Sequence, residues 1–261
     1  MSVTFATVGE LMLDVVAQRG AHDHAGAVRV RVGGTAANGA VWAARAGARA
    51  TAVGRVGDDA AGRALRAELE ARGIETAFAV DPAEPTGTVL LVDAERVVDR
   101  GANRNLVPAD LPALAVDALL VSGNALRHAD SRSAGLAALA GGAAWTGATG
   151  GASDNGNARV LVVNAREARA LTDARAEDAA RLLAERYEIA CVTLGGEGAL
   201  LAHDDRVERC AAERNVPEPT RFGAGDAFAA VLLVELARGL SPAEALVAAC
   251  AAGTSAAAGR P

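Results

Sequence analysis

Short apolar runs that alternate with helical patterns constrain the fold of this chain more than any other feature. Runs typical of buried strands lie at 4–8, 118–121, 160–163 and 190–194. Helical patterns lie at 36–46, 59–72, 177–187 and 226–238, and a further helix begins after Ser241. Strands that alternate with helices predict an α/β fold in which a mostly parallel sheet is covered on both faces.

Each of these apolar runs ends in a glycine or polar turn. The turns contain Gly9-Glu10, 122–124, Asn164 and Gly195-Gly196. Ligands of such sheets bind beyond the carboxyl ends of the parallel strands. We therefore expect these turns to lie along one edge of the sheet and to form a single site.

The segment at the start of the helical pattern 226–238 carries the strongest functional signal. Gly223, Ala224 and Gly225 are small, so their backbone N–H groups can close on an anion at the helix N-terminus. Asp226 follows at the edge of this anion site, where a carboxylate can accept a proton from an attacking hydroxyl. The segment therefore predicts phosphoryl transfer to an alcohol, with Asp226 as the proton acceptor.

The composition argues against several other classes of function. The formal net charge is −6 and no basic stripe with interleaved aromatics is present, which argues against nucleic-acid binding. All 26 basic residues are arginine, so the chain has no Walker A lysine. No apolar run is long enough to span a membrane, and the three cysteines have no paired spacing, as is typical of reduced thiols. We expect a cytoplasmic protein without a membrane or nucleic-acid partner.

Two segments depart from the alternation of strands and helices. Residues 28–32 alternate apolar and basic side chains, and residues 76–100 contain extended pieces at 76–80, 88–92 and 96–99. We expect one domain over 1–261, with a small flap of strands formed by segments 15–32 and 76–103. Residues 141–157 are rich in glycine, alanine and small polar residues, which predicts a loop.

Several motifs, in order along nearly the whole chain, resemble those of the ribokinase-like carbohydrate kinases, also called the PfkB family. They are Gly9-Glu10 with Asp14, then 33–38, 54–59 with Gly62, 85–88, 100–103, 164–167, 193–198 and 223–226. The resemblance implies a three-layer αβα fold with a mostly parallel central sheet and a small β-strand lid. It also implies an ATP-dependent carbohydrate kinase.

The resemblance assigns the N-terminal motifs and the lid to the phosphate acceptor. Asp14 would bind sugar hydroxyls, because a carboxylate can accept two hydrogen bonds from a vicinal diol. Gly33 and Gly34 let the backbone approach the acceptor closely, and Asn38 offers both a donor and an acceptor. The turn after the lid adds Asn103 as a further substrate-binding residue.

The Asn-x-x-Glu motif of Asn164 and Glu167 is assigned by the same resemblance to magnesium and the nucleotide. At a helix start this spacing places both side chains on one face. Mg²⁺ keeps several of its waters, so the pair would hold the ion through water near the phosphates. The alternative is a capping pair without a role in ligand binding.

The next motifs are assigned to ATP. Thr193 ends a strand that leads into a glycine turn, and the family uses this turn for the phosphates and ribose of the nucleotide; the residues concerned are Gly195, Gly196 and Gly198. Cys250 stands where some relatives have asparagine or histidine beside the adenine ring, and it packs like a small apolar residue.

Thr220 and Arg221 stand where the family usually has aspartate and threonine. That aspartate helps to ligate a monovalent cation in some relatives, and Thr220 carries no charge, so we expect no potassium site. Arg221 would instead bring a fixed positive charge near the transferred phosphate and the nucleotide.

We predict that the chain moves the γ-phosphate of ATP to a hydroxyl, in particular a hydroxymethyl group, of a small sugar or sugar acid. A nucleoside kinase of the same family is an alternative, but it would usually line its base pocket with aromatics, which make up only 3% of this chain. A non-catalytic sugar- or nucleotide-binding relative is another alternative, against which the intact Gly-Ala-Gly-Asp segment argues. Exposed edges of the lid strands favour a homodimer through the lid.

Overall fold

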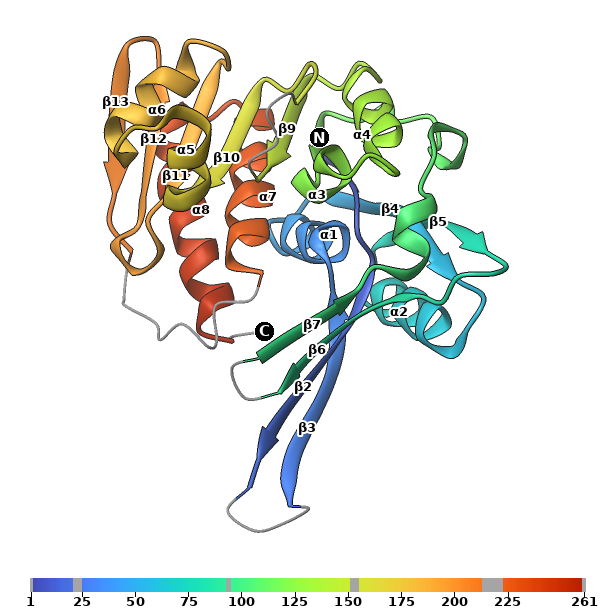
Figure 1. The fold of residues 1–261 in the computed structure, drawn as a ribbon. Helices are drawn as coiled ribbons and strands as arrows, with labels where there is room; N and C mark the ends of the chain where they lie inside the picture. Colours follow the sequence, from blue (N-terminus) through green and yellow to red (C-terminus); the bar gives the residue numbers. More distant parts are fainter. Residues whose placement is uncertain (1, 21–24, 93–94, 151–154, 213–222, 260–261) are drawn as a thin grey trace.

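The computed structural model of the chain describes residues 2–20, 25–92, 95–150, 155–212 and 223–259. They form a three-layer αβα domain with a smaller sheet that projects from one side (Figure 1). Within these residues the main sheet has the strand order β13-β12-β11-β10-β9-β8-β1-β4-β5. Neighbouring strands from β11 through to β5 in this list pair in parallel. Strand β12 pairs antiparallel with both β11 and β13. The predicted mostly parallel sheet is confirmed.

The strands of the main sheet are short. Their bounds are β1 (Thr4–Val8), β4 (Arg49–Gly57), β5 (Glu75–Asp81), β8 (Ala118–Val121), β9 (Trp145–Thr149), β10 (Val160–Asn164), β11 (Ile189–Thr193), β12 (Ala199–His203) and β13 (Arg206–Cys210). Successive side chains of a strand point to opposite faces. Phe5 and Ala6 of β1 accordingly belong to two different buried clusters, one on each face of the sheet.

The helices cover both faces of this sheet (Figure 1). One face carries α1 (Thr35–Arg45), α2 (Ala60–Ala71), α7 (Ala224–Ala237) and α8 (Pro242–Ala257). The other carries α3 (Gly123–Arg127), α4 (Arg132–Leu139), α5 (Ala165–Thr172) and α6 (Ala176–Ala184). None of the helices in the described ranges has both the length and the apolar character that a membrane crossing requires.

The predicted strands at 4–8 and 118–121 form β1 and β8 with the expected bounds. The expected loop over 141–157 is wrong for Trp145–Thr149, which forms β9 between β8 and β10. A Cβ atom at Gly147 of this strand would lie 2.6 Å from Cδ1 of Leu233 on α7. Small residues thus let α7 pack closely on β9. The same small residues are typical of loops, which is why the sequence predicted one here.

The lid is a separate four-stranded sheet within the described residues, in the order β3-β2-β6-β7. Its strands are β2 (Met12–Arg19), β3 (Gly26–Gly33), β6 (Gly87–Val92) and β7 (Glu95–Asp99), and they extend away from the main sheet (Figure 1). The expectation that 76–80 belongs to the lid is wrong, because Glu75–Asp81 is β5 and pairs with β4 in the main sheet. Most side chains of β5 are partly exposed, as on an edge strand of either sheet.

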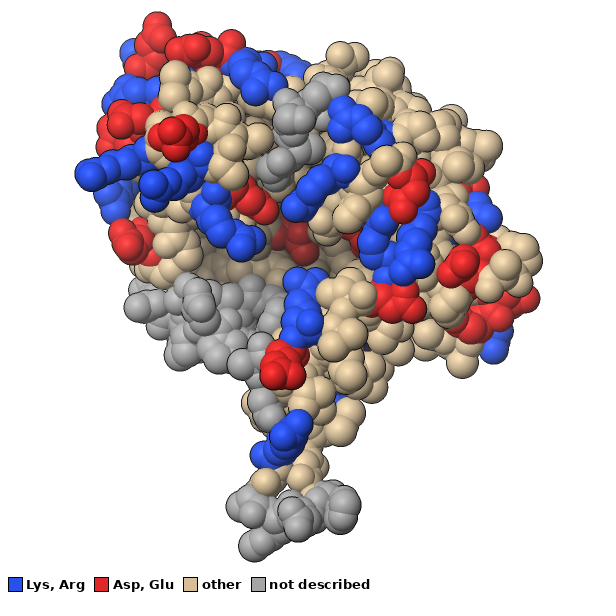
Figure 2. Space-filling view, in the orientation of Figure 1, with Lys and Arg blue, Asp and Glu red and all other residues tan. Residues whose placement is uncertain are grey.

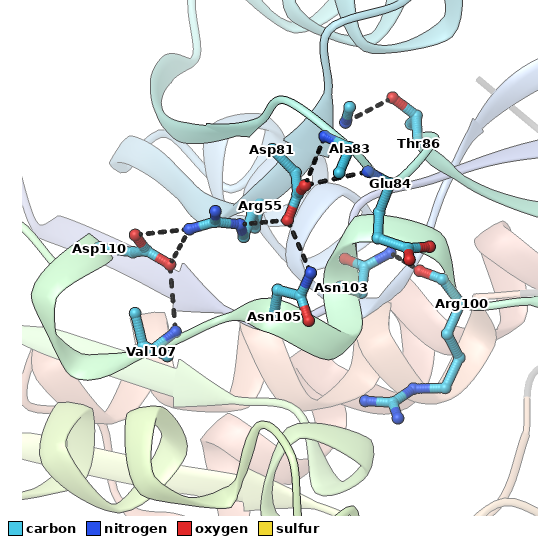
Figure 3. Close-up of polar contacts among 11 residues, drawn as sticks. Arg55, Asp81, Ala83, Glu84, Thr86, Arg100, Asn103, Asn105, Val107 and Asp110 are labelled. Atoms are coloured by element: carbon cyan, nitrogen blue, oxygen red, sulfur yellow. Dashed lines mark hydrogen bonds and ion pairs between the residues drawn. The ribbon is translucent and has the colours of Figure 1, made fainter.

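A largely buried ion-pair network joins the main sheet to the turns that carry the lid (Figure 3). The guanidinium of Arg55 donates to Asp81 at 3.0 Å and to both carboxylate oxygens of Asp110 at 3.0 Å. Asp81 also accepts a hydrogen bond of 2.8 Å from Asn105. This bond and two backbone N–H groups hold the pKa of Asp81 well below its ordinary value. The network thereby ties β4 and β5 to the 3-10 helices that follow β7, η1 (Gly101–Asn105) and η2 (Pro108–Asp110).

Arg55→Ala is expected to lower the free energy of unfolding by about 3 kcal/mol, because it leaves the carboxylate of Asp81 buried without its cation. Only 4% of the Asp81 side chain is exposed, so water can compensate little. Chemical denaturation at pH 7 measures the change. The control is Arg104→Ala, whose exposed ion pair with Asp99 predicts a loss below about 1 kcal/mol. Equal losses in the two variants would contradict the role of the network.

Candidate active site

Three adjoining cavities lie in a row along the carboxyl edge of the main sheet. The outer cavity, of about 100 Å³, lies between the glycine turn after β11 and helix α8. The central cavity, of about 210 Å³, lies at the ends of β8, β9 and β10. The lid-side cavity, of about 200 Å³, lies between α1 and the lid strands. Gly225 lines the outer and central cavities, and Asp226 lines the central and lid-side cavities, so the start of α7 lies at both junctions.

The turns that follow the buried strands meet along this row. Glu10 lines the lid-side cavity, Asn124 and Asn164 line the central one, and Gly195 lines the outer one. The turns therefore lie along one edge of the sheet, as expected, and that they form a single site stays a prediction. Figure 2 shows the hollow between the lid and the main domain, with acidic side chains in its depth and basic side chains around its mouth.

The first turn of α7 is built to leave backbone donors at the cavity wall. Gly223 precedes the helix with φ 75°, in the left-handed region that favours glycine, and no described side chain caps this helix end. A Cβ atom on Gly225 would meet nothing within 4 Å, so this residue faces open space. The N–H groups of Ala224 and its neighbours can therefore serve an anion, as the sequence predicts.

Asp226 lies in the first turn of α7 and its carboxylate is held by α1. Asn38 Nδ2 donates to Asp226 Oδ2 at 2.9 Å. Burial raises the pKa of Asp226, hydrogen bonds from Asn38 and Thr35 lower it, and the negative charge of Asp14 raises it again. The net result is a pKa above the ordinary value of an aspartate, which suits a group that must take up a proton.

Asp14 lies on lid strand β2 and lines the lid-side cavity together with Asn38 and Gly34. Gly33 packs directly on its carboxylate, since a Cβ there would lie 2.3 Å from Oδ1 of Asp14. Burial raises the pKa of Asp14, and the guanidinium of Arg31, at 3.5 Å, lowers it. Gly34 has φ 86°, and a Cβ there would lie 2.2 Å from the carbonyl oxygen of Glu10. Both glycines are thus required by close approaches of chain segments around this cavity.

Glu10 and Thr35 also line the lid-side cavity. The sequence analysis placed both within motifs of the site but assigned neither of them a role of its own. Glu10 Oε2 accepts a hydrogen bond of 2.5 Å from Ser122 Oγ. Burial raises the pKa of Glu10, while the bond from Ser122 lowers it. Thr35 donates to Asp226. The available signals were the acid directly after β1 and the polar residue directly after Gly34.

Asn103 lies at the base of the lid rather than on the wall of the lid-side cavity. Its Oδ1 accepts from the N–H of Leu11 at 2.9 Å, and its Nδ2 donates to the carbonyl oxygens of Leu11 and Arg100 at 3.0 and 2.9 Å. Both N–H donors of its amide are therefore used by the backbone, and Figure 3 shows the bond to Arg100. The position joins the end of the lid to the chain between β1 and β2, and it leaves no donor for a ligand.

Asn164 and Glu167 form a capping box at the start of α5 and also line the central cavity. Asn164 Oδ1 accepts from the N–H of Glu167 at 2.9 Å, and Glu167 Oε2 accepts from the N–H of Asn164 at 3.0 Å. Glu167 Oε1 lies near Gly150, on the cavity side. The residues that the structure describes contain no group of three or more metal-ligating side chains. One free carboxylate oxygen at a cavity wall fits a magnesium ion held through its water.

The outer cavity brings together the residues predicted for the nucleotide. Its lining includes Thr193, Gly195, Gly196, Gly198 and Cys250. Gly198 has φ 100°, and a Cβ there would lie 2.0 Å from the carbonyl oxygen of Cys210, so the turn after β11 packs tightly on β13. All three cysteines are free thiols, and burial raises the pKa of Cys250 to about 12. Arg221 lies outside the described residues.

Comparison with known proteins identifies relatives of the whole domain. The profile of the pfkB family of carbohydrate kinases matches residues 4–258. The ribokinase of Bacillus subtilis (strain 168) is 45% identical over 83 residues, which is 30% of this chain and 28% of that protein. The chain therefore aligns with less than a third of the length of this curated relative.

Solved structures align over nearly the whole chain. Adenosine kinase from Sinorhizobium meliloti has a TM-score of 0.83 at 22% identity, covering 97% of this chain and 93% of that chain, which shows the shared fold. A double mutant of fructokinase from Vibrio cholerae O395, in its fructose-, ADP- and potassium-bound form, has a TM-score of 0.80 at 25% identity. The alignment covers 97% of this chain and 90% of that chain.

Gly34→Ala is expected to lower the free energy of unfolding by more than about 1 kcal/mol, because its φ and the nearby carbonyl oxygen of Glu10 exclude a Cβ atom. The matched change Gly225→Ala is expected to cost less than about 0.5 kcal/mol, since its Cβ meets open space. Urea denaturation of the two variants measures the difference. A loss in Gly225→Ala as large as that in Gly34→Ala would show that the two glycines are not distinguished by close approach.

Proposed function

Because this chain belongs to the pfkB family of carbohydrate kinases, we propose that it transfers the γ-phosphate of ATP to a hydroxyl of a small sugar or sugar acid. The observation that carries the proposal is the position of Asp226. Its half-buried carboxylate lies between the central cavity, next to the predicted nucleotide residues, and the lid-side cavity, next to the predicted acceptor residues. A proton acceptor is needed at that junction for an alcohol to attack a phosphate.

The acceptor is proposed to bind in the lid-side cavity with a hydroxymethyl group directed at Asp226. Asp14, Asn38 and the backbone at Gly34 line this cavity and offer hydrogen-bond partners to sugar hydroxyls. Asn38 has a second task, because its hydrogen bond orients the carboxylate of Asp226. Asn103 is assigned to positioning the lid rather than to the acceptor, since the backbone takes both of its N–H donors.

Asp226 is proposed to accept the hydroxyl proton while the oxygen forms its bond to the γ-phosphorus and the bond to ADP breaks. The transition state of phosphoryl transfer is loose, so the proton leaves late and a carboxylate suffices as base. The N–H groups at Gly223, Ala224 and Gly225 would bind the negative charge of the transferred group. Closure of the lid over the acceptor would exclude water and so prevent hydrolysis of ATP.

The nucleotide is proposed to extend from the central into the outer cavity. The phosphates would lie near Asn164 and Glu167, and the adenine near Cys250. Magnesium, held through water by Asn164 and Glu167, would supply charge screening of the phosphates. Arg221 stays a proposed cation for the transferred phosphate.

A nucleoside kinase is the second candidate within the same family. The described lining of the lid-side cavity contains no aromatic side chain that could stack on a base, which favours a sugar. A non-catalytic relative is disfavoured by the carboxylate retained at Asp226. Measurement of ADP release with panels of sugars, sugar acids and nucleosides tests all three possibilities. ADP release with nucleosides alone, or no ADP release with any compound of the panels, would contradict the proposal.

Asp226→Asn is expected to reduce turnover by about 100-fold or more, because an amide cannot accept the hydroxyl proton. The change keeps the size of the side chain, so ATP and the acceptor identified in the panel should bind with little change. Coupled ADP-release kinetics and calorimetric titration measure the two properties. Turnover near that of the unchanged protein would refute the assignment of Asp226 as base.

The pH profile offers a control for this role. The raised pKa of Asp226 predicts that kcat falls on the acid side at a pH above the ordinary aspartate value of about 4, because the base must be ionised. The hydrogen bond from Asn38 favours the charged form, so Asn38→Ala should raise the pKa further and move this acid limb to higher pH. A limb that stays in place or moves to lower pH would contradict the role of Asn38.

A homodimer through the lid is proposed from its outer face. Val30, Val15, Leu90 and Val97 form one row across all four lid strands. Asp14, next to Val15, lines the lid-side cavity, so by strand alternation this row points away from that cavity. Val30 is 59% exposed and Val97 64% exposed. Apolar rows of this kind on a sheet with open edges are well suited to pair with a second copy by two-fold symmetry.

Val30→Asp is expected to convert a dimer into a monomer, because two carboxylates would be buried against each other near the symmetry axis. Sedimentation velocity at micromolar concentration measures the state. Val247→Asp is the matched control, since Val247 on α8 is also 59% exposed but lies outside the lid. The proposed lid interface would be contradicted if the protein without substitutions is monomeric at every concentration. It would also be contradicted if Val30→Asp and Val247→Asp dissociate the dimer equally.

A further inference from the structure

The central cavity holds one basic side chain among its described lining residues, Arg127 at the end of α3. The same lining contains two acidic side chains, Asp226 and Glu167. A triphosphate in this cavity would meet these carboxylates and would be repelled unless cations balance them. The chain has no lysine, so any fixed side-chain cation that balances them must be an arginine or a protonated histidine.

Arg127 is held in place by a chain of hydrogen bonds that begins at the buried floor of the site. Glu10 accepts from Ser122 Oγ at 2.5 Å, and Ser122 Oγ accepts from the N–H of Asn124 at 3.2 Å, which caps α3. Asn124 Oδ1 then accepts from Nη2 of Arg127 at 2.8 Å. The guanidinium is therefore positioned at the cavity wall by a neutral amide.

The space between Arg127 and Glu167 is kept open by Gly150. A Cβ atom built on Gly150 would lie 3.8 Å from Nη2 of Arg127 and 3.8 Å from Oε1 of Glu167. The two charged groups thus flank the same glycine, and within the described part of the chain Arg127 forms no ion pair. Its positive charge is not neutralised there, and its remaining N–H groups are available to a ligand.

We propose that Arg127 binds the γ-phosphoryl group of ATP and stabilises it during transfer, an inference that rests on the proposed kinase function. Arg127 and the first turn of α7 line the same cavity, so the guanidinium and the N–H groups of that turn would both contact the phosphoryl oxygens. Arginine suits this task because its planar fork donates two parallel hydrogen bonds to phosphate. Glu167 would remain free for the water shell of the metal ion.

Arg127→Ala tests this role in the full chain. With the acceptor found in the panel, kcat is expected to fall by about 100-fold or more, whereas KM for the acceptor changes less than about threefold. Added guanidinium at millimolar concentration should restore part of the lost turnover in this variant and none in Arg104→Ala, an exposed arginine next to the lid. Asn124→Ala, which removes the group that positions Arg127, should give a smaller loss of kcat.

Binding of ATP and ADP gives a second readout that needs no acceptor. Because the proposed contact is to the γ-phosphoryl group, Arg127→Ala should weaken the binding of ATP by about 10-fold and leave the binding of ADP unchanged. If no acceptor supports ADP release but this selective loss is found, the kinase proposal fails and the phosphate contact of Arg127 stands. The inference would be overturned if Arg127→Ala leaves the ratio of ATP to ADP affinity unchanged and also leaves turnover intact. It would equally be overturned if that ratio is unchanged and the lost turnover is not restored by guanidinium. Urea denaturation checks that the variant is folded.

Discussion

The hydrogen bond from Asn38 to Asp226 joins two segments that are 188 residues apart and orients the carboxylate on which the proposed proton transfer depends. It fixes α1 against the first turn of α7, at the place where the central and lid-side cavities meet. The same bond favours the charged form of the carboxylate, whereas burial raises its pKa. Apolar residues of α1 and α7 pack in one core cluster, and the hydrogen bond adds the polar contact that places the carboxylate.

Several residues serve the fold and the site at once. Asn164 and Glu167 cap α5 through one oxygen each, and Glu167 keeps its other oxygen at the cavity wall. The capping interpretation and the metal interpretation of this motif are thus compatible rather than exclusive. The amide of Asn103 instead bonds to the backbone at Leu11 and Arg100, which supports the proposal that it positions the lid. A polar residue in a family motif can therefore act by positioning the lid.

The errors of sequence reasoning arose where local pattern and tertiary packing disagree. Trp145–Thr149 has the composition of a loop, but it is a strand because its backbone pairs with β8 and β10. Its glycine, Gly147, lets Leu233 of α7 approach the strand closely. Residues 76–80 were assigned to the lid because an extended local pattern does not show which sheet a strand joins, and only the pairing with β4 decides it. Glu10 was placed in a motif but received no role of its own, because the bond from Ser122, 112 residues away, cannot be seen in the sequence.

The sequence by itself determined the class of fold, the strands at 4–8 and 118–121, and the gathering of their turns at one edge, because apolar periodicity and glycine placement are local properties of the chain. The small residues and the acid at 223–226 were also visible locally, as was their place at a helix start. Only the tertiary structure decided which side chains face the cavities and which form hydrogen bonds with the backbone. That choice depends on contacts between distant segments, such as Asn38 with Asp226 and Asn103 with Leu11, and on burial that no local pattern encodes.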